Sequence, residues 1–324
     1  MKRVFLMGGV LALVATTILV GCGRQEKRPV QIGVMQIVSH PILDAVRDGF
    51  VAGMKQAGYV EGKDVQYDFQ NAQGEMTTAQ AIARKFVSDK VAMIFSIATP
   101  TSQAAAKATK DIPIVFGAVT DPVGAGIVRS PQRPGGNVTG VSDLVPVHEQ
   151  IGLLLEIVPK VKRLGWVYNA GEANSQYAKK LIEAECKKRG LILVTATVAN
   201  SNEVYAAAKS LVGRVDALYV AVDNTTASAV ESLVKVAEDA KLPLLASDTG
   251  LVERGALATI GTDYFSVGKM SAETAARILK GERPGDIPVR FAQGQDLWVN
   301  LKSAKRMGVT VPEAVVKRAK KVIR

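Results

Sequence analysis

The stretch from Val91 to Ala106 changes from an unbroken apolar run to a polar helix start within two residues, Thr99 and Pro100. Continuous Val, Met, Ile and Phe residues are typical of a parallel strand that is covered on both faces. Threonine is a favourable N-cap, and proline is favoured at the first helical position. The stretch therefore predicts a buried parallel strand that leads directly into a helix, which is the basic unit of an α/β protein.

The start of this predicted helix could hold a small anion. The backbone N–H groups of Thr101, Ser102 and Gln103 have no acceptor within the helix, and the positive end of the helix dipole lies beside them. The hydroxyl groups of Thr99, Thr101 and Ser102 add further donors. We therefore expect these four residues to hold the carboxylate of a ligand. A well-capped helix that binds nothing has the same sequence, so the junction alone leaves both interpretations open.

A weaker second copy of the pattern supports the ligand interpretation. Residues 215–224 align with residues 91–100, and an Ala-rich helix follows each of them. Residues 241–249 then align with residues 111–121 through a shared Leu/Ile-Pro step before an apolar strand. Two similar α/β halves with polar residues at matching strand ends predict two lobes whose loops face each other across a cleft.

Polar residues at the predicted strand ends form the candidate site. Besides the four helix-start residues, it comprises Thr120, Asp121, Asn174, Asp223, Asn224, Ser247 and Asp248. A carboxylate at such a corner either caps the next helix or contacts a ligand. Capping is the default interpretation for Asp121. Both interpretations stay open for Asp223 and Asp248, to which we assign the ammonium group of the ligand.

The first 22 residues predict export and lipid attachment. A basic start at Lys2 and Arg3 precedes an apolar run, and the sequence Leu-Val-Gly-Cys ends at Cys22. This ending is similar to the lipobox of bacterial lipoproteins, so we expect a signal peptide over residues 1–21, a lipidated Cys22 and a tether over residues 22–30. A transmembrane anchor is the alternative, but two Gly and two Thr residues interrupt the apolar run, which is near the lower length limit.

Composition narrows the remaining possibilities. Of 41 basic residues, Lys2 and Arg3 belong to the predicted signal peptide, which leaves 39 basic against 30 acidic residues in the mature chain. The basic residues are spread along helices and gather at the C-terminus without any nucleic-acid motif, so we expect a surface near an anionic membrane and no nucleic-acid site. With Cys22 lipidated, Cys186 has no partner for a disulfide and is expected to be a buried structural thiol.

Motifs for several kinds of chemistry are missing. The sequence contains no Rossmann fingerprint, no P-loop and no nucleophile elbow. His40 and His148 are the only histidines, and each stands where a helix is expected to start. Two scattered imidazoles make a transition-metal site improbable, so we expect neither a metal nor a cofactor.

Four stretches give the chain a resemblance to a known family, the ABC-transporter substrate-binding proteins related to the TrpX-type binders of aromatic amino acids. They are Ile97-Ala-Thr-Pro-Thr-Ser-Gln-Ala, Ile112-Pro-Ile-Val-Phe-Gly-Ala-Val-Thr-Asp-Pro-Val-Gly-Ala-Gly, Arg133-Pro-Gly-Gly-Asn-Val-Thr-Gly-Val and Val299-Asn-Leu-Lys-Ser-Ala-Lys-Arg-Met-Gly-Val. The resemblance implies a two-lobed periplasmic-binding-protein (type I) architecture of the α/β class, in which each lobe is a parallel sheet flanked by helices. It also implies a three-segment hinge that closes on a ligand.

On this pattern, the helix expected at residues 266–279 returns to the first lobe, and the chain crosses back near Pro288. The expected first lobe comprises residues 31–142 and 265–288, and the second comprises residues 143–264 and 289–324. The first crossing is expected near residues 141–145.

The sequence thus predicts a monomeric, non-enzymatic lipoprotein on the outer side of a membrane. It would capture a small molecule and deliver it to ABC permease subunits. The expected ligand is an amino acid, and the resemblance includes aromatic amino acids in this class. Two alternatives come from other classes of protein, a sensor that signals to a membrane receptor and an exported α/β enzyme.

Overall fold

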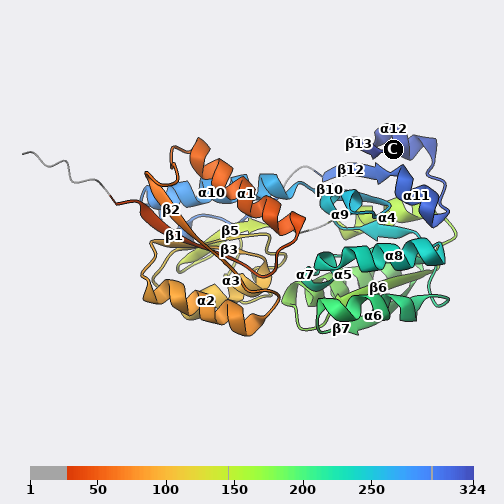
Figure 1. Cartoon of the computed structure of the whole chain (residues 1–324), viewed down its shortest axis with the longest axis horizontal. Helices are drawn as coiled ribbons and strands as arrows, with labels where there is room; N and C mark the ends of the chain where they lie inside the picture. Colours follow the sequence, from red (N-terminus) through yellow and green to blue (C-terminus); the bar gives the residue numbers. More distant parts are fainter. Residues whose placement is uncertain (1–27, 145, 293–294) are drawn as a thin grey trace, which may run out of the picture.

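The computed structural model describes residues 28–144, 146–292 and 295–324, and shows two α/β lobes joined by several chain segments (Figure 1). The predictions for the signal peptide and for lipidation of Cys22 lie outside these residues, as does Val145 at the end of the expected first crossing. No helix within the described ranges is both long enough and apolar enough to cross a bilayer.

The first lobe is built on a six-stranded parallel sheet. Its order is β11-β5-β4-β3-β1-β2. The strands are β1 (Val30–Gln36), β2 (Val65–Asn71), β3 (Met93–Ile97), β4 (Ile114–Gly117), β5 (Val138–Ser142) and β11 (Arg290–Phe291). Helix α1 (Pro41–Gln56) packs with α10 (Tyr264–Leu279) on one face, and α2 (Met76–Ser88) packs with α3 (Thr99–Ala108) on the other (Figure 1). The 3₁₀ helix η2 (Pro284–Asp286) lies next to β5.

The second lobe has a seven-stranded sheet in the order β13-β12-β10-β9-β8-β6-β7, in which only β12 runs antiparallel to its neighbour β10. Its strands are β6 (Arg163–Asn169), β7 (Ile192–Val198), β8 (Ala217–Val220), β9 (Leu244–Ala246), β10 (Ala258–Thr262), β12 (Gln295–Asn300) and β13 (Lys321–Ile323). Its helices are α4 (Val147–Ile157), α5 (Ala173–Arg189), η1 (Ser201–Glu203), α6 (Val204–Leu211), α7 (Asn224–Ser228), α8 (Val230–Ala240), α9 (Thr249–Glu253), α11 (Leu301–Met307) and α12 (Glu313–Arg318).

The aligned half-patterns of the sequence occupy equivalent places in the two sheets. Strand β3 lies between β1 and β4, and β8 lies between β6 and β9. Every residue of β3 and β8 is buried, as expected for strands covered on both faces. The α/β class and the two-lobed architecture predicted from the sequence are confirmed. Cys186 is buried, and burial raises the pKa of its thiol to about 11, which suits a structural role.

The lobes are connected by three short crossings. The chain leaves the first lobe after β5, returns at Asp263 between β10 and α10, and leaves again after β11. The last crossing lies later in the chain than expected, because the sequence predicts that the chain enters the second lobe near Pro288. Arg290 and Phe291 pair with Val141 and Ser142, so these two residues extend the first sheet instead of starting the second lobe. A two-residue strand has too little pattern to be assigned to a sheet from sequence.

The junction between β3 and α3 also differs in detail from the prediction. Ala98, not Thr99, is the N-cap, with φ = 81° in the left-handed region, and Thr99 is the first helical residue. The hydroxyls of Thr101 and Ser102 donate to the carbonyl oxygens of Ile97 and Ala98, which fixes this sharp turn. Because Ala98 is the N-cap, the Thr99 hydroxyl does not cap the helix.

Candidate ligand-binding site

The site lies where the topology of both sheets reverses. In the first lobe this point lies between β1 and β3, because the chain continues from β1 to β2 on one side and from β3 to β4 on the other. In the second lobe the corresponding point lies between β6 and β8. Ligands of open α/β sheets bind beyond the carboxyl ends of the strands at these points. The carboxyl ends of the two sheets face each other here, and Gly250 of α9 comes close to the Ile42 side chain of α1 across the gap.

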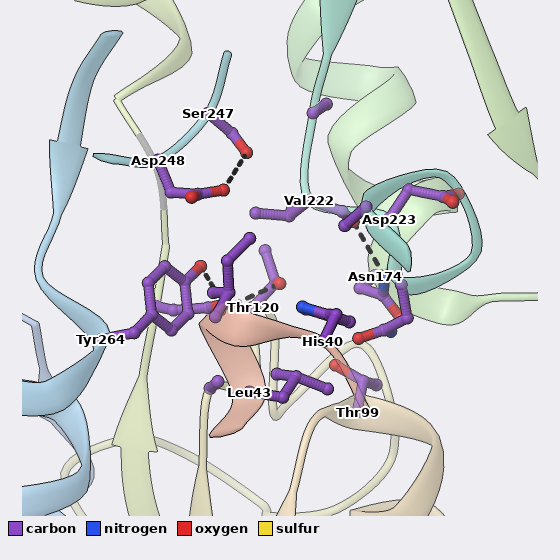
Figure 2. Close-up of a pocket in the computed structure, with 16 residues that line it drawn as sticks. His40, Leu43, Thr99, Thr120, Asn174, Val222, Asp223, Ser247, Asp248 and Tyr264 are labelled. Carbon is purple, nitrogen blue, oxygen red and sulfur yellow. Dashed lines mark hydrogen bonds between the residues drawn. The ribbon is translucent and has the colours of Figure 1, made fainter. Parts of the chain in front are cut away.

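A narrow cavity lies between the lobes and is lined by residues of both. Seven of the residues predicted from sequence line it. They are Thr99 and Thr120 from the first lobe and Asn174, Asp223, Asn224, Ser247 and Asp248 from the second. Apolar side chains, including Ile42, Leu43 and Val222, complete the wall (Figure 2). None of the described residues lining this cavity is Lys or Arg.

Four predicted residues lie outside the cavity lining. The hydroxyls of Thr101 and Ser102 are fully buried in the first turn of α3, and the Ser102 N–H donates to the Ala98 carbonyl. The Gln103 side chain donates to the Ala125 carbonyl, and Asp121 accepts from the N–H of Gly124 in its own loop. Their hydrogen-bonding groups are thus used within the first lobe, except the Thr101 N–H, which finds no acceptor among the described residues.

Three buried residues of the lining carry polar atoms without a partner. The atoms are Thr99 Oγ1, both ring nitrogens of His40 and Asn174 Oδ1. None of them has a hydrogen-bond partner among the described residues. His40 is 5% exposed, and burial together with the charge of Arg254 lowers its pKa to about 4, so the ring is neutral and offers one donor and one acceptor. Buried polar groups are nearly always paired, so these atoms are available to hydrogen-bond a water or a ligand in the cavity.

Asp143 and Tyr264 join the site from the crossings between the lobes. Thr120 Oγ1 donates to one oxygen of Asp143 at 3.0 Å, and the Tyr264 hydroxyl donates to the other at 2.8 Å (Figure 2). Burial raises the pKa of Asp143. One carboxylate thus links the end of β4, the first crossing and the start of α10.

Asp223 lies at the end of β8 and is held by three donors. One oxygen accepts from the Thr226 N–H at 2.7 Å, and the other accepts from the Asn169 N–H at 2.7 Å and from the Ser175 hydroxyl at 2.6 Å. Burial and the neighbouring charge of Glu172 raise the pKa of Asp223 to about 7. Asp223 therefore does cap α7, and it still faces the cavity.

Asp248 lies at the matching corner after β9. Its oxygens accept from the Leu251 N–H at 3.0 Å and from the Ser247 hydroxyl at 3.2 Å. Burial raises its pKa to about 6. Behind this corner, the buried Gln150 amide donates to the Ser247 carbonyl at 2.8 Å and accepts from the Tyr219 hydroxyl, which fixes the loop that carries Asp248.

Sequence reasoning missed His40, Asp143 and Tyr264. His40 precedes Pro41 and lies at a helix start, as the sequence predicts, but nothing in the local sequence shows that its ring faces a cavity. Asp143 and Tyr264 are 121 positions apart and meet only because two crossings run side by side. Of these three residues, only His40 has a local sequence signal, which is the unusual His-Pro helix start.

The chain belongs to a family of solute-binding proteins. Residues 31–323 match the model of the ABC transporter substrate binding protein family. Proteins of this family act outside the cytoplasm and are not known as enzymes.

Several relatives are similar over nearly the full length. The tyrosine-binding protein of Clostridioides difficile (strain R20291) is 40% identical over 315 residues, which cover 93% of this chain and 90% of that protein. A crystal structure of an ABC domain from Streptococcus pneumonia in complex with L-Trp is 36% identical, with a TM-score of 0.88 and coverage of 91% of this chain and 100% of that one.

A third relative differs more in shape although it is closer in sequence. It is the ligand-free, open structure of a substrate-binding protein with adhesive properties from Clostridium difficile, which is 42% identical over 90% of this chain and 99% of that one, with a TM-score of 0.68. The present lobes are thus arranged more like those of the L-Trp complex than like those of the open structure.

Proposed function

We propose that this substrate-binding protein captures one aromatic L-amino acid, tryptophan or tyrosine, between its two lobes. The observation that carries the proposal is the set of buried, unpartnered polar atoms on Thr99, His40 and Asn174 around a cavity that also contains buried carboxylates. The names of two relatives, the tyrosine-binding protein and the L-Trp complex, support the aromatic class.

The carboxylate of the amino acid is assigned to the start of α3. Thr99 Oγ1 is a free donor there, and the N–H groups of Thr99 and Thr101 have no acceptor among the described residues. The positive end of the helix dipole favours an anion at this position. Since Ser102 and Gln103 use their groups elsewhere, Thr99 and Thr101 are the residues that carry this assignment.

The ammonium group is assigned to the carboxylates of the second lobe, Asp223 and Asp248. A carboxylate offers about four lone-pair sites. Three are occupied in Asp223 and two in Asp248, so each can still accept from a ligand. No Lys, Arg or His forms an ion pair with either within the described residues, and an ammonium group would supply the missing positive charge.

Identification of the ligand tests the proposal directly. Mass spectrometry of the small molecules released when the purified protein is denatured is expected to detect tryptophan or tyrosine. Thermal unfolding with each of the twenty amino acids is expected to show stabilisation by these two, since a ligand at 1,000 times its Kd adds about 4 kcal/mol. Release of a sugar, or equal stabilisation by leucine and tryptophan, would contradict the aromatic class.

We further infer that Cys22 is the lipidated N-terminus and that the captured ligand passes to permease subunits in the membrane. The basic start, the apolar run and the Leu-Val-Gly-Cys sequence support the anchor. Cys22→Ser is expected to abolish labelling by a fatty-acid probe and to release the protein from the membrane fraction. Unchanged labelling of the variant would refute lipidation at this residue.

The exported-enzyme alternative has little support in this site. Within the described residues, no Ser or Cys side chain is hydrogen-bonded to a histidine, and His40 has no group that orients it as a base. A captured amino acid is therefore expected to be recovered unchanged after prolonged incubation, which chromatography of the bound fraction would show.

A further inference from the structure

Glu172, which the sequence did not single out, is a buried carboxylate that is hydrogen-bonded to Asn174 of the cavity lining. It is 7% exposed and immediately precedes α5. One oxygen accepts from the N–H and the hydroxyl of Thr225, at 3.0 and 2.8 Å. The other accepts from the N–H and the side-chain amide of Asn224, at 3.0 and 2.6 Å, and from the Asn174 amide at 2.8 Å.

These bonds determine how Asn174 faces the cavity. Its amide nitrogen donates to Glu172 at 2.8 Å. It also donates to the Val222 carbonyl at 2.9 Å (Figure 2), so both strong donor positions are used. The amide oxygen is left buried and without a donor among the described residues, in a side chain that is 4% exposed. An amide held in this way offers the ligand an acceptor and no donor.

Two acidic side chains meet here without a basic one. The charge of Glu172 acts on Asp223, and within the described residues no Lys, Arg or His forms an ion pair with either carboxylate. Buried charges are stable only when they are paired or fully hydrogen-bonded. The five donors around Glu172 provide the hydrogen bonds, and the countercharge is still missing.

We propose that Glu172 is a positioning residue, which holds the Asn174 amide so that Asn174 Oδ1 accepts a hydrogen bond from the ammonium group of the ligand. The proposal rests on the proposed function, because it needs an amino acid in the cavity. It assigns ammonium recognition to Asn174 as well as to the aspartates, and it gives Glu172 a role in binding although Glu172 does not contact the ligand.

A double-mutant cycle tests the coupling between the two residues. L-tryptophan and L-tyrosine are titrated calorimetrically into the wild type, Glu172→Gln, Asn174→Ala and the double variant. Gln keeps the size of Glu but replaces one acceptor oxygen by an NH₂ group, which cannot accept from Asn174. Each single variant is expected to lose roughly ten- to a hundredfold in affinity, the range for a charge-assisted hydrogen bond. The double variant is expected to bind no more weakly than Asn174→Ala alone.

Two controls separate positioning from general damage to the fold. Glu185→Gln makes the same change at a carboxylate of the same lobe that is 8% exposed and bonded to His148 and Arg189, away from the cavity, and is expected to bind like the wild type. Indole-3-propionate lacks only the ammonium group of tryptophan and is expected to bind more weakly than tryptophan. Its affinity should be the same for the wild type and for Asn174→Ala, because it has no group that donates to Asn174 Oδ1.

The outcomes distinguish this inference from the proposed function. If the wild type binds neither amino acid, the proposed function itself fails. If the wild type binds and Glu172→Gln binds equally well, or if the losses of the two single variants multiply in the double variant, the positioning role is overturned. Asn174→Ala alone, which removes no buried charge, tests the acceptor even if Glu172→Gln unfolds.

Discussion

The hydroxyl groups of two threonines at the start of α3 have different roles. Thr99 Oγ1 has no partner among the described residues, whereas the Thr101 hydroxyl donates to Ile97 and Ala98. Thr99→Val is therefore expected to weaken amino acid binding about tenfold or more and to leave the melting temperature of the ligand-free protein unchanged. Thr101→Val is the matched control, which should lower stability by about 1 kcal/mol and affect binding much less. The reverse pattern in calorimetry and thermal unfolding would refute the assignment of the carboxylate.

The buried aspartates make ligand binding depend on pH. The pKa is about 7 for Asp223 and about 6 for Asp248 in the ligand-free protein, so both take up protons as the pH falls from 7.5 to 5. A neutral carboxyl group cannot form an ion pair with an ammonium group, so affinity is expected to fall over this range and binding near pH 6.5 to release protons. His40, with a pKa of about 4, stays neutral throughout and does not contribute. Titration in buffers with different ionisation enthalpies measures the released protons.

Asparagine variants identify the groups responsible. Asp223→Asn or Asp248→Asn keeps the helix cap, because Asn caps about as well as Asp, and is expected to weaken binding roughly ten- to a hundredfold at pH 7.5. Asp223→Asn should also flatten the pH dependence above pH 6. Wild-type affinity in both variants, or an affinity that rises as the pH falls, would contradict the assignment of the ammonium group.

At the scale of elements, the packing of α1 against α10 holds the returning segment in the first lobe. A Cβ atom added at Gly268 of α10 would lie 2.1 Å from the Val46 carbonyl oxygen and 2.6 Å from the Phe50 nitrogen. These are backbone atoms, so the helices would have to separate. Gly268→Ala is expected to lower the free energy of unfolding by about 2 kcal/mol, measured with urea.

Gly152 in α4 provides the control for this helix contact. A Cβ atom there meets only the end of the flexible Arg189 side chain, at 3.3 Å. Gly152→Ala should therefore be neutral or stabilise the protein by up to about 1 kcal/mol through helix propensity. If both variants unfold at the same urea concentration as the wild type, close packing of α1 and α10 is not what holds the segment.

The elements themselves could largely be predicted from sequence, whereas their contacts could not. The apolar run before Thr99 is long and uniform enough to indicate a buried strand, and its second copy indicated a second lobe. The left-handed Ala98 and the two-residue strand β11 depend on tertiary contacts that leave no local pattern. The same holds for the candidate site, because strand-end residues such as Asp248 follow a rule of sheet topology, while His40 and Asp143 reach the cavity only through the arrangement of the crossings.

For the whole molecule, the comparison with two relatives supports the prediction that the lobes open and close. The TM-score is 0.88 with the L-Trp complex and 0.68 with the ligand-free, open structure, although the open structure has the higher sequence identity. A ligand that contacts both lobes favours the closed arrangement by its additional contacts there. Asp263, between β10 and α10, is one place where the backbone would have to bend.

Small-angle X-ray scattering of the mature protein, first freed of ligand and then saturated with L-tryptophan or L-tyrosine, tests this account most directly. Binding is expected to reduce the radius of gyration, because Thr99 in the first lobe and the second-lobe residues Asp223 and Asp248 contact the same molecule. Thr99→Val should require at least about tenfold more ligand for the same change. A radius of gyration that stays constant at saturating ligand would contradict capture of the amino acid by closure of the two lobes.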